Sequence, residues 1–188
     1  MSGKPFRYVV GLLGVSGSGK SVVARRLYEH HGLTRIRFGE PQRDMLRSGF
    51  GLTDAEIDGP DRLRPNDRLG GHTPQHLIHT LSHVWGRASI HSNLWVNEWS
   101  RRVGMVEGGV LADDIQRPNE ADATRTAGGV VIRVTRRDYT PTNPQALQRL
   151  SMIQHDAEII NTGDLEELVV RTDEFVVQLN RALAQLAA

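Results

Sequence analysis

The 188-residue sequence contains no cysteine and only two lysines, Lys4 and Lys20. The absence of cysteine excludes disulfide bonds, cysteine nucleophiles and thiolate metal sites, and it suits a reducing compartment, with the cytoplasm as the default expectation. The other 21 basic residues are arginines. Because the net charge is only +1, the whole protein has no general attraction to nucleic acid, and any contact with DNA would depend on a local basic patch.

Long hydrophobic runs are also missing. The apolar stretch near the N-terminus, residues 8–13, is short and interrupted by glycine, so we expect neither a signal peptide nor a membrane span. With 38% hydrophobic and 24% charged residues, the composition is typical of soluble globular proteins. The length suits one domain of ordinary size, and we predict a single domain over residues 1–188.

The most informative motif is the stretch from Gly14 to Ser21, which reads GVSGSGKS and matches the phosphate-binding pattern G-x-x-x-x-G-K-[ST]. It follows the apolar run at 8–13, a predicted strand, and opens a segment with helical spacing. Such glycines let backbone amides surround a phosphate, while Lys20 reaches the β and γ phosphates and the Ser21 hydroxyl can ligate Mg²⁺. The motif therefore predicts an ATP and Mg²⁺ site formed by Gly14, Val15, Ser16, Gly17, Ser18, Gly19, Lys20 and Ser21.

The remaining pattern alternates apolar runs with helical segments. The predicted strands span residues 8–13, 33–38, 109–112, 130–135 and 157–160. This alternation predicts an α/β fold with a mostly parallel sheet and helices on both faces, closed by an amphipathic helix over 164–188. Residues 50–72 are rich in glycine and charge, as in loops that move or bind, and we assign 50–103 to an acceptor-binding or lid insertion.

A helix is predicted to start at Thr73, because a capping hydroxyl is followed by proline. Three histidines share one side of this helix: His76, His79 and His83. They suggest either a metal site or a polar face lining a cleft, and no carboxylate or cysteine joins the stripe. We expect Trp99 to lie in the core, and Trp85 and Trp95 either to do the same or to stack on a base.

Several segments together resemble one family. Besides GVSGSGKS, they are TPQHLIHTLSHVWGRASIHSNLW at 73–95, VLADDIQRPNEADATRTAGGVVIRVTR at 110–136 and AEIINTGDLEEL at 157–168. They are similar to the bacteriophage deoxynucleoside monophosphate kinases, a branch of the P-loop nucleotide kinases, and the likeness spans nearly the whole chain. The resemblance implies the P-loop NTPase fold and an ATP-dependent phosphotransferase.

Two positions depart from the family pattern. Arginines that the family carries after the Thr-Pro pair and after the strand-end aspartate are replaced by Gln75 and Gln116. A monophosphate carries a charge of roughly −1.5 to −2, and each charge-assisted hydrogen bond to it is worth roughly 1.5 to 3 kcal/mol. Losing two such partners would weaken monophosphate binding unless neighbouring arginines compensate. The candidates are Arg43, Arg62, Arg87, Arg117 and Arg125.

A related group of phage P-loop kinases phosphorylates the hydroxymethyl group of 5-hydroxymethyluracil in DNA. That acceptor is a neutral alcohol, which needs a proton acceptor rather than a clamp for a dianion. Asp113 and Asp114 follow the predicted strand at 109–112, where one could organise Mg²⁺ through water and the other accept the proton. Alternatively, either aspartate only caps a turn.

We therefore favour a kinase acting on 5-hydroxymethyluracil in phage DNA, a step in thymidine hypermodification. A deoxynucleoside monophosphate kinase is the first alternative, and a P-loop ATPase or switch module is the second. The predicted catalytic residues are Lys20, Asp113, Asp114 and Arg87. Arg136 joins the phosphate-binding loop at the nucleotide, and Ser21 and Asp114 are the metal residues. The acceptor residues are Arg43, Gln75, His76, His79, Trp85, Gln116 and Arg117.

Overall fold

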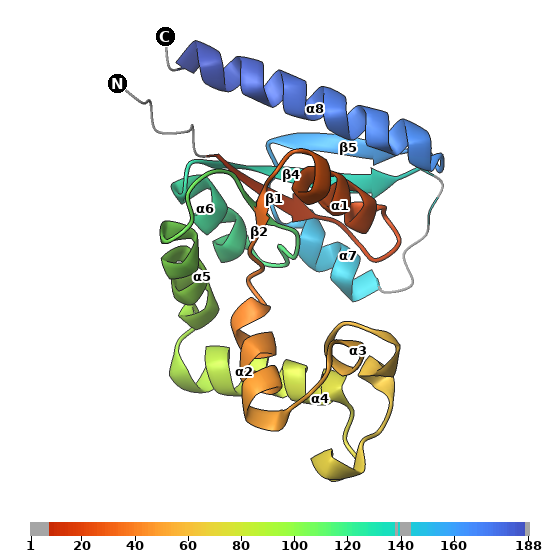
Figure 1. Ribbon diagram of the computed structural model, residues 1–188, viewed down its shortest axis with the longest axis vertical. Coiled ribbons are helices and arrows are strands. Elements are labelled where there is room, and N and C mark those ends of the chain that lie inside the picture. Colours follow the sequence, from red (N-terminus) through yellow and green to blue (C-terminus); the bar gives the residue numbers. More distant parts are fainter. Residues whose placement is uncertain (1–7, 138, 140–143, 187–188) are drawn as a thin grey trace. The chain divides into compact units, whose positions relative to one another are not determined.

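The computed structural model describes residues 8–137, 139 and 144–186 (Figure 1). It divides the chain into two compact units. The first, which we call the sheet unit, comprises Met1–Ile36 and Met105–Ala188, and the second, the inserted unit, comprises Arg37–Gly104. The inserted unit therefore begins earlier than the insertion that the sequence suggests at residue 50.

The sheet unit contains a five-stranded sheet with the strand order β2-β3-β1-β4-β5. The strands are β1 (Val9–Leu13), β2 (Thr34–Arg35), β3 (Val110–Ala112), β4 (Gly129–Arg136) and β5 (Ala157–Asn161). Every pairing between neighbouring strands is parallel, which confirms the predicted α/β fold. Strand β2 is shorter than the predicted 33–38 because only Thr34 and Arg35 pair with β3.

Helices cover both faces of this sheet (Figure 1). On one face, Val10 and Leu12 of β1 share a core cluster with Leu27 of α1 (Lys20–His30) and Leu168 of α8 (Leu165–Leu186). Because side chains alternate along a strand, Gly11 faces the opposite side, where a Cβ would lie 2.9 Å from the Thr124 side chain of α6 (Pro118–Thr126). Helix α7 (Pro144–Ser151) precedes β5.

The final helix is confirmed, with its last two predicted residues outside the described part of the chain. Its core contacts are Leu168, Val176 and Leu179. Leu165, although apolar, is exposed because it opens the helix directly after the turn that follows β5.

The inserted unit is built from helices. They are α2 (Glu40–Phe50), α3 (Asp54–Ile57), η1 (Pro60–Leu63), η2 (Asp67–Leu69), α4 (Pro74–His79), η3 (Thr80–Ile90) and α5 (Leu94–Gly104). The predicted start at Thr73 is confirmed, because its hydroxyl accepts a hydrogen bond from the His76 amide. From Thr80 onward the helix is of the π type, which the sequence did not indicate. The polar segment 50–72 forms short helices rather than one long loop.

Aromatic residues form part of the core of the inserted unit. Trp99 is fully buried and its ring stacks on Phe38 with centroids 4.3 Å apart, which confirms the expected core position. Trp95 is also buried, and its ring nitrogen donates to the Ser82 carbonyl at 2.9 Å. Trp85 remains 43% exposed, so only this tryptophan of the three could stack on a base without rearrangement of the core.

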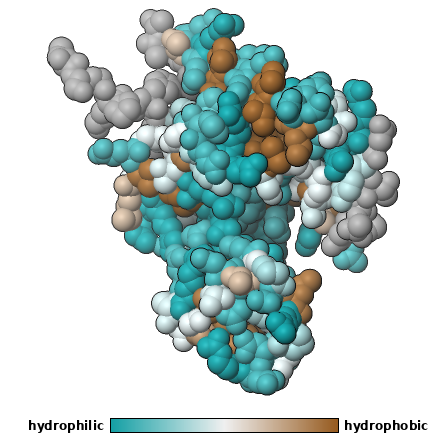
Figure 2. All heavy atoms as spheres, turned by 45° about the vertical axis from the view of Figure 1, so that its right-hand side comes forward, coloured by the Kyte–Doolittle hydropathy of each residue, from teal (hydrophilic) through white to brown (hydrophobic). Residues whose placement is uncertain are grey.

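Hydrophilic atoms cover most of the face shown in Figure 2, and the hydrophobic atoms there gather mainly in the upper central part of the view. None of the helices in the described part of the chain combines the length and the apolar character that a bilayer crossing requires.

Candidate active site

The predicted phosphate-binding loop joins β1 to α1 and has the backbone that its glycines predict. Gly17 and Gly19 have φ angles of 82° and 100°, in the left-handed region that favours glycine. A Cβ on Gly14 would lie 2.5 Å from the Val134 carbonyl oxygen. Helix α1 begins at Lys20, and within the described residues no side chain caps this end. Its first amides are therefore available to an anion.

Asn161, at the end of β5, supports the phosphate-binding loop through a side-chain hydrogen bond. The Asn161 side-chain amide donates to the Ser18 carbonyl at 3.1 Å, and its side-chain oxygen accepts from the Gly163 amide at 2.8 Å. Gly19 packs so closely on Asn161 that a Cβ would lie 2.6 Å from the amide nitrogen. We did not assign Asn161 a role from the sequence, although it directly follows the predicted strand 157–160 in a segment that resembles the kinase family.

Lys20 and the two predicted aspartates share one electrostatic environment. Asp113 and Asp114 directly follow β3, which pairs with β1, the strand before the loop. Burial lowers the pKa of Lys20, whereas the charges of Asp113 and Asp114 act in the opposite direction. The structure therefore brings the three predicted catalytic residues together at the carboxyl edge of the sheet.

A fourth residue, Arg35, completes this group and was missed by the sequence analysis. Its guanidinium donates to Asp113 Oδ2 at 2.6 Å. Within the described part of the chain, the other oxygen, Oδ1, is buried and has no hydrogen-bond partner. Nothing in the spacing of a strand-end arginine and an aspartate 78 positions later signals this pairing, which depends on β2 lying beside β3.

The residues beside the loop fit Mg²⁺, which prefers oxygen ligands and keeps several waters or phosphate oxygens. Ser21 and Asp113 line one pocket at the start of α1, and the partnerless Asp113 Oδ1 can serve a bound cation or its water. Asp114 is partly buried beside them. Over the described residues, no group of three or more histidine, cysteine or acidic side chains could hold a metal. A metal at Ser21 would therefore need ligands from the nucleotide, and the suggested histidine metal site has no support.

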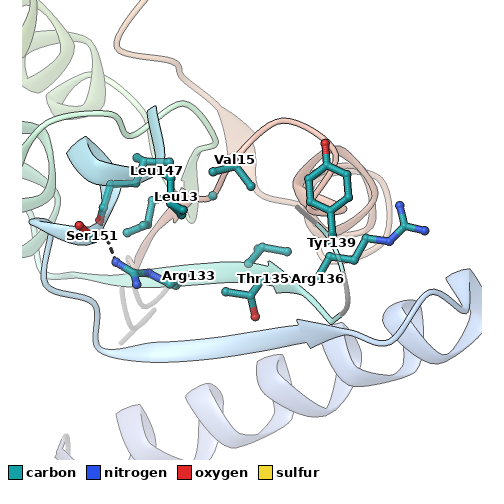
Figure 3. Close-up of a pocket in the computed structure, with 11 residues that line it drawn as sticks. Leu13, Val15, Arg133, Thr135, Arg136, Tyr139, Leu147 and Ser151 are labelled. Carbon is teal, nitrogen blue, oxygen red and sulfur yellow. Dashed lines mark hydrogen bonds between the residues drawn. The ribbon is translucent and has the colours of Figure 1, made fainter. Parts of the chain in front are cut away.

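A second pocket, of about 200 Å³, opens beside the loop at the ends of β1 and β4 (Figure 3). Arg136, predicted to contact the nucleotide, lines it, and its guanidinium lies 5.8 Å from the centre of the Tyr139 ring. The Tyr139 hydroxyl reaches Gly17, where a Cβ would lie 2.5 Å from it. Arg133 donates to the Leu150 carbonyl at 2.8 Å at the other end of this pocket. The predicted Arg136 is thus close to the phosphate-binding loop.

The inserted unit contains a cluster of arginines around Asp58, which we call the arginine cluster: Arg37, Arg43 and Arg62. Arg37 donates to Asp58 at 2.9 Å and to Glu40 at 2.6 Å, and Arg43 donates to Asp58 at 2.9 Å. Burial and the charges of Arg43 and Arg37 lower the pKa of Arg62, although Asp58 opposes this change. Among the described residues, the Arg62 Nε is buried without a hydrogen-bond partner.

The predicted acceptor residues are divided between the two units. Arg43, Gln75, His76, His79 and Trp85 belong to the inserted unit, as does the predicted catalytic Arg87, which donates to the Ser82 carbonyl at 3.2 Å. Gln116 and Arg117 belong to the sheet unit. The Gln116 side chain is exposed, and its backbone amide donates to Glu120 at 2.8 Å. The functional roles of these residues remain predictions.

No family model matches the chain. A protein of Acanthamoeba polyphaga mimivirus named "Putative deoxynucleotide monophosphate kinase" is 26% identical over 175 residues, covering 85% of this chain and 91% of the viral protein.

Two solved structures share the architecture. The crystal structure of TT1252 from Thermus thermophilus has a TM-score of 0.55 and 15% identity, covering 92% of this chain and 97% of its own. A gluconokinase from Sinorhizobium meliloti has a TM-score of 0.53 and 16% identity, covering 98% and 99%. The fold is that of the small P-loop kinases. The name of the viral relative describes a kinase, in agreement with the phosphotransferase activity that the sequence predicts.

Proposed function

We propose that this P-loop kinase transfers the γ-phosphate of ATP to a deoxynucleoside monophosphate. The main support for this acceptor is the arginine cluster of the inserted unit. In this cluster, Arg62 has a buried Nε with no partner among the described residues. Arg62 is partly buried, and removing its Nε from water is costly unless an anion joins the guanidinium. The phosphate of a monophosphate is an anion of the right charge.

The charges of the arginine cluster support this assignment. Asp58 accepts hydrogen bonds from both Arg37 and Arg43. Glu40 accepts hydrogen bonds from Arg37 and Arg47. The carboxylates are thus already bound by other arginines, and positive charge remains at Arg62. Charge-assisted hydrogen bonds to a phosphate are worth roughly 1.5 to 3 kcal/mol each, so a monophosphate held by Arg62 and a neighbour would gain substantial affinity.

In this proposal, ATP, the phosphate donor, binds to the sheet unit. The loop amides and Lys20 would hold the phosphates of ATP, and Lys20 would stabilise the charge on the transferring group. Ser21 with Asp113 or Asp114 would hold Mg²⁺, which supplies charge neutralisation at the phosphates when bound. The acceptor oxygen of a monophosphate is already ionised, so no general base is required.

The name of the viral relative, a putative deoxynucleotide monophosphate kinase, describes the same class of acceptor. The two glutamines, Gln75 and Gln116, remain departures from the kinase family that the chain resembles. Arginines in the inserted unit could supply the positive charge that these neutral glutamines lack. This favours a monophosphate acceptor over the DNA acceptor that the sequence alone suggested.

Phosphorylation of 5-hydroxymethyluracil in DNA is the second candidate. It is favoured by the neutral Gln75 and Gln116 and by two adjacent carboxylates, Asp113 and Asp114, of which one could take the proton of an alcohol. The exposed ring of Trp85 offers a stacking surface for a base.

One experiment separates these functions. The protein is incubated with γ-labelled ATP and, in separate reactions, with each deoxynucleoside monophosphate, plain duplex DNA and duplex containing 5-hydroxymethyluracil. We expect a labelled diphosphate from at least one monophosphate and no labelled DNA. Label in the modified duplex alone would establish the second candidate, and hydrolysis of ATP without transfer to any acceptor would indicate an ATPase module.

A further inference from the structure

The pairing register of β2 with β3 places Arg35 close to the Asp113 carboxylate. In the β2–β3 pairing, Arg35 is the partner of Leu111, and Asp113 follows Leu111 by two residues. Residues two apart in an extended chain share a face, so the Arg35 side chain can reach along β3 to Asp113. The resulting bond, from the guanidinium to Oδ2, is 2.6 Å long.

This bond makes the two oxygens of Asp113 different. Oδ2 is occupied by Arg35, whereas Oδ1 is buried and has no partner among the described residues. The Asp113 side chain is only 8% exposed, so Oδ1 cannot exchange freely with bulk water. A buried carboxylate oxygen without a donor is costly, which indicates that a ligand satisfies it in the working enzyme.

The partner of this oxygen is indicated by the surroundings. Ser21, Arg35 and Asp113 line one pocket at the start of α1. Asp113 is the strongest of the charges that favour the protonated form of Lys20, ahead of Asp114. A cation that enters beside the Ser21 hydroxyl would therefore meet Asp113 Oδ1.

We infer that Arg35 is a positioning residue, which fixes Asp113 so that Oδ1, with the Ser21 hydroxyl, holds Mg²⁺ directly or through water. Asp113 then takes the metal role that we gave to Asp114 from the sequence. The inference rests on the proposed use of Mg²⁺ with ATP, and it is independent of the acceptor.

The guanidinium suits this task better than an ammonium group. Arg35 lies over the Tyr28 ring, with the central carbon 6.0 Å from the ring centre, and planar guanidinium groups stack on aromatic faces. The ring restricts Arg35 from one side while Asp113 binds it from another. Lysine would keep the charge and one donor but lose the stacking, so Arg35→Lys should retain part of the effect.

The test measures binding of Mn²⁺, as a spin-active substitute for Mg²⁺, to the complex of the protein with a non-hydrolysable ATP analogue. Free Mn²⁺ is quantified by electron paramagnetic resonance. Loss of a residue that orients a metal ligand typically weakens metal binding by 10- to 100-fold. We expect Arg35→Gln and Asp113→Asn each to weaken Mn²⁺ binding by at least about tenfold. The double variant should be no weaker than Asp113→Asn alone, because the two residues act through one contact.

Matched variants separate positioning from folding. Arg181 lies at an exposed position of α8, outside this pocket, so Arg181→Gln should leave Mn²⁺ binding unchanged. Affinity for the metal-free analogue and the midpoint of thermal unfolding should stay close to wild type in Arg35→Lys, whose Mn²⁺ affinity should lie between those of wild type and Arg35→Gln.

Two results would overturn the inference. Normal Mn²⁺ affinity in folded Arg35→Gln or, if that variant does not fold, wild-type affinity in Arg35→Lys would remove Arg35 from the metal site. Weakened Mn²⁺ binding in Asp114→Asn but not in Asp113→Asn would return the metal role to Asp114. Failure of the proposed acceptor looks different, because the wild-type protein would then bind Mn²⁺ and the analogue normally and leave every monophosphate unlabelled.

Discussion

Asn161 and Ser18, 143 residues apart in the sequence, are joined by a hydrogen bond of 3.1 Å from the Asn161 side-chain amide to the Ser18 carbonyl. Both residues are buried. Asn161 ends β5, the last strand, so the C-terminal part of the sheet unit supports the loop that we predict binds phosphate. The shape of this loop therefore depends on a residue that lies outside its motif.

Replacing Asn161 by alanine should disturb the loop without removing any residue predicted to touch ATP. The change leaves the Ser18 carbonyl buried without its donor, at a cost of about 1 to 3 kcal/mol, and should also weaken ATP binding severalfold. Calorimetry of ATP binding and urea unfolding would measure both effects. Asn180→Ala, at an exposed position of α8, is the control. Unchanged ATP affinity in Asn161→Ala would show that the loop keeps its shape without this support.

Replacing Lys20 by alanine should abolish transfer while the protein remains folded. Removing one group that stabilises transition-state charge typically lowers kcat by about 100- to 1000-fold. Lys20→Arg should not restore activity, since a guanidinium does not replace a compact ammonium group in such a loop. Single-turnover rates with labelled ATP and circular dichroism spectra provide the measurements. Activity of Lys20→Ala within about tenfold of wild type would contradict the assignment of the loop.

Gly19 should tolerate no side chain. Alanine there would adopt a φ angle of 100° and place its Cβ 2.6 Å from the Asn161 amide nitrogen. We expect Gly19→Ala to destabilise the protein by more than about 1 kcal/mol. Gly49→Ala is the matched control, because Gly49 lies inside α2 and has open space around its Cα. That change should stabilise the protein by about 0.5 to 1 kcal/mol. Equal effects at the two positions would argue against a strained loop.

Arg62→Gln should raise KM for the monophosphate by at least about tenfold and leave KM for ATP unchanged, because each charge-assisted bond to phosphate contributes roughly 1.5 to 3 kcal/mol. The same change should not lower the unfolding midpoint, since Arg62 is a partly buried cation with no partner for its Nε among the described residues. Steady-state kinetics and thermal unfolding test both statements. Arg64→Gln, whose side chain is 78% exposed, serves as the control. A monophosphate KM unaffected by Arg62→Gln would remove this residue from the acceptor site.

Asp173 should make stability depend on acid pH. The pKa of Asp173 is lowered from 3.8 to about 2, chiefly by the hydrogen bond from Arg26 and also by the contact with His31. Burial of the carboxyl acts in the opposite direction and is outweighed. A carboxyl whose pKa is lower in the folded state stabilises the protein above its unfolded pKa, and this contribution is lost as the pH falls from 3.8 to about 2.

The Asp173 side chain is a third exposed, so solvent screening reduces the contribution to about 1 kcal/mol. We expect Asp173→Asn to be less stable than wild type at pH 6, with a difference that closes below pH 4, as measured by urea unfolding. Glu174→Gln, at the adjacent exposed position, should show no such difference. A gap that persists at pH 2 would point to lost packing instead of lost charge.

The sequence alone predicted the sheet, its parallel strands and the phosphate-binding loop, because each depends on local patterns. Apolar runs separated by helical segments indicate a parallel α/β sheet, and the spacing from Gly14 to Ser21 specifies a turn that only glycines can form. Trp99 was also placed correctly, since a large apolar ring gains most from burial.

Three features were decided only by the tertiary structure: the bond between Arg35 and Asp113, the support of Ser18 by Asn161 and the arginine cluster around Asp58. Each joins residues distant in the sequence, so its existence depends on how strands and helices pack rather than on spacing along the chain. The π-helix at Thr80–Ile90 belongs with them, because apolar and polar spacing does not distinguish it from an α-helix. Local propensity thus determines which elements form, whereas packing determines which distant charged and polar groups meet.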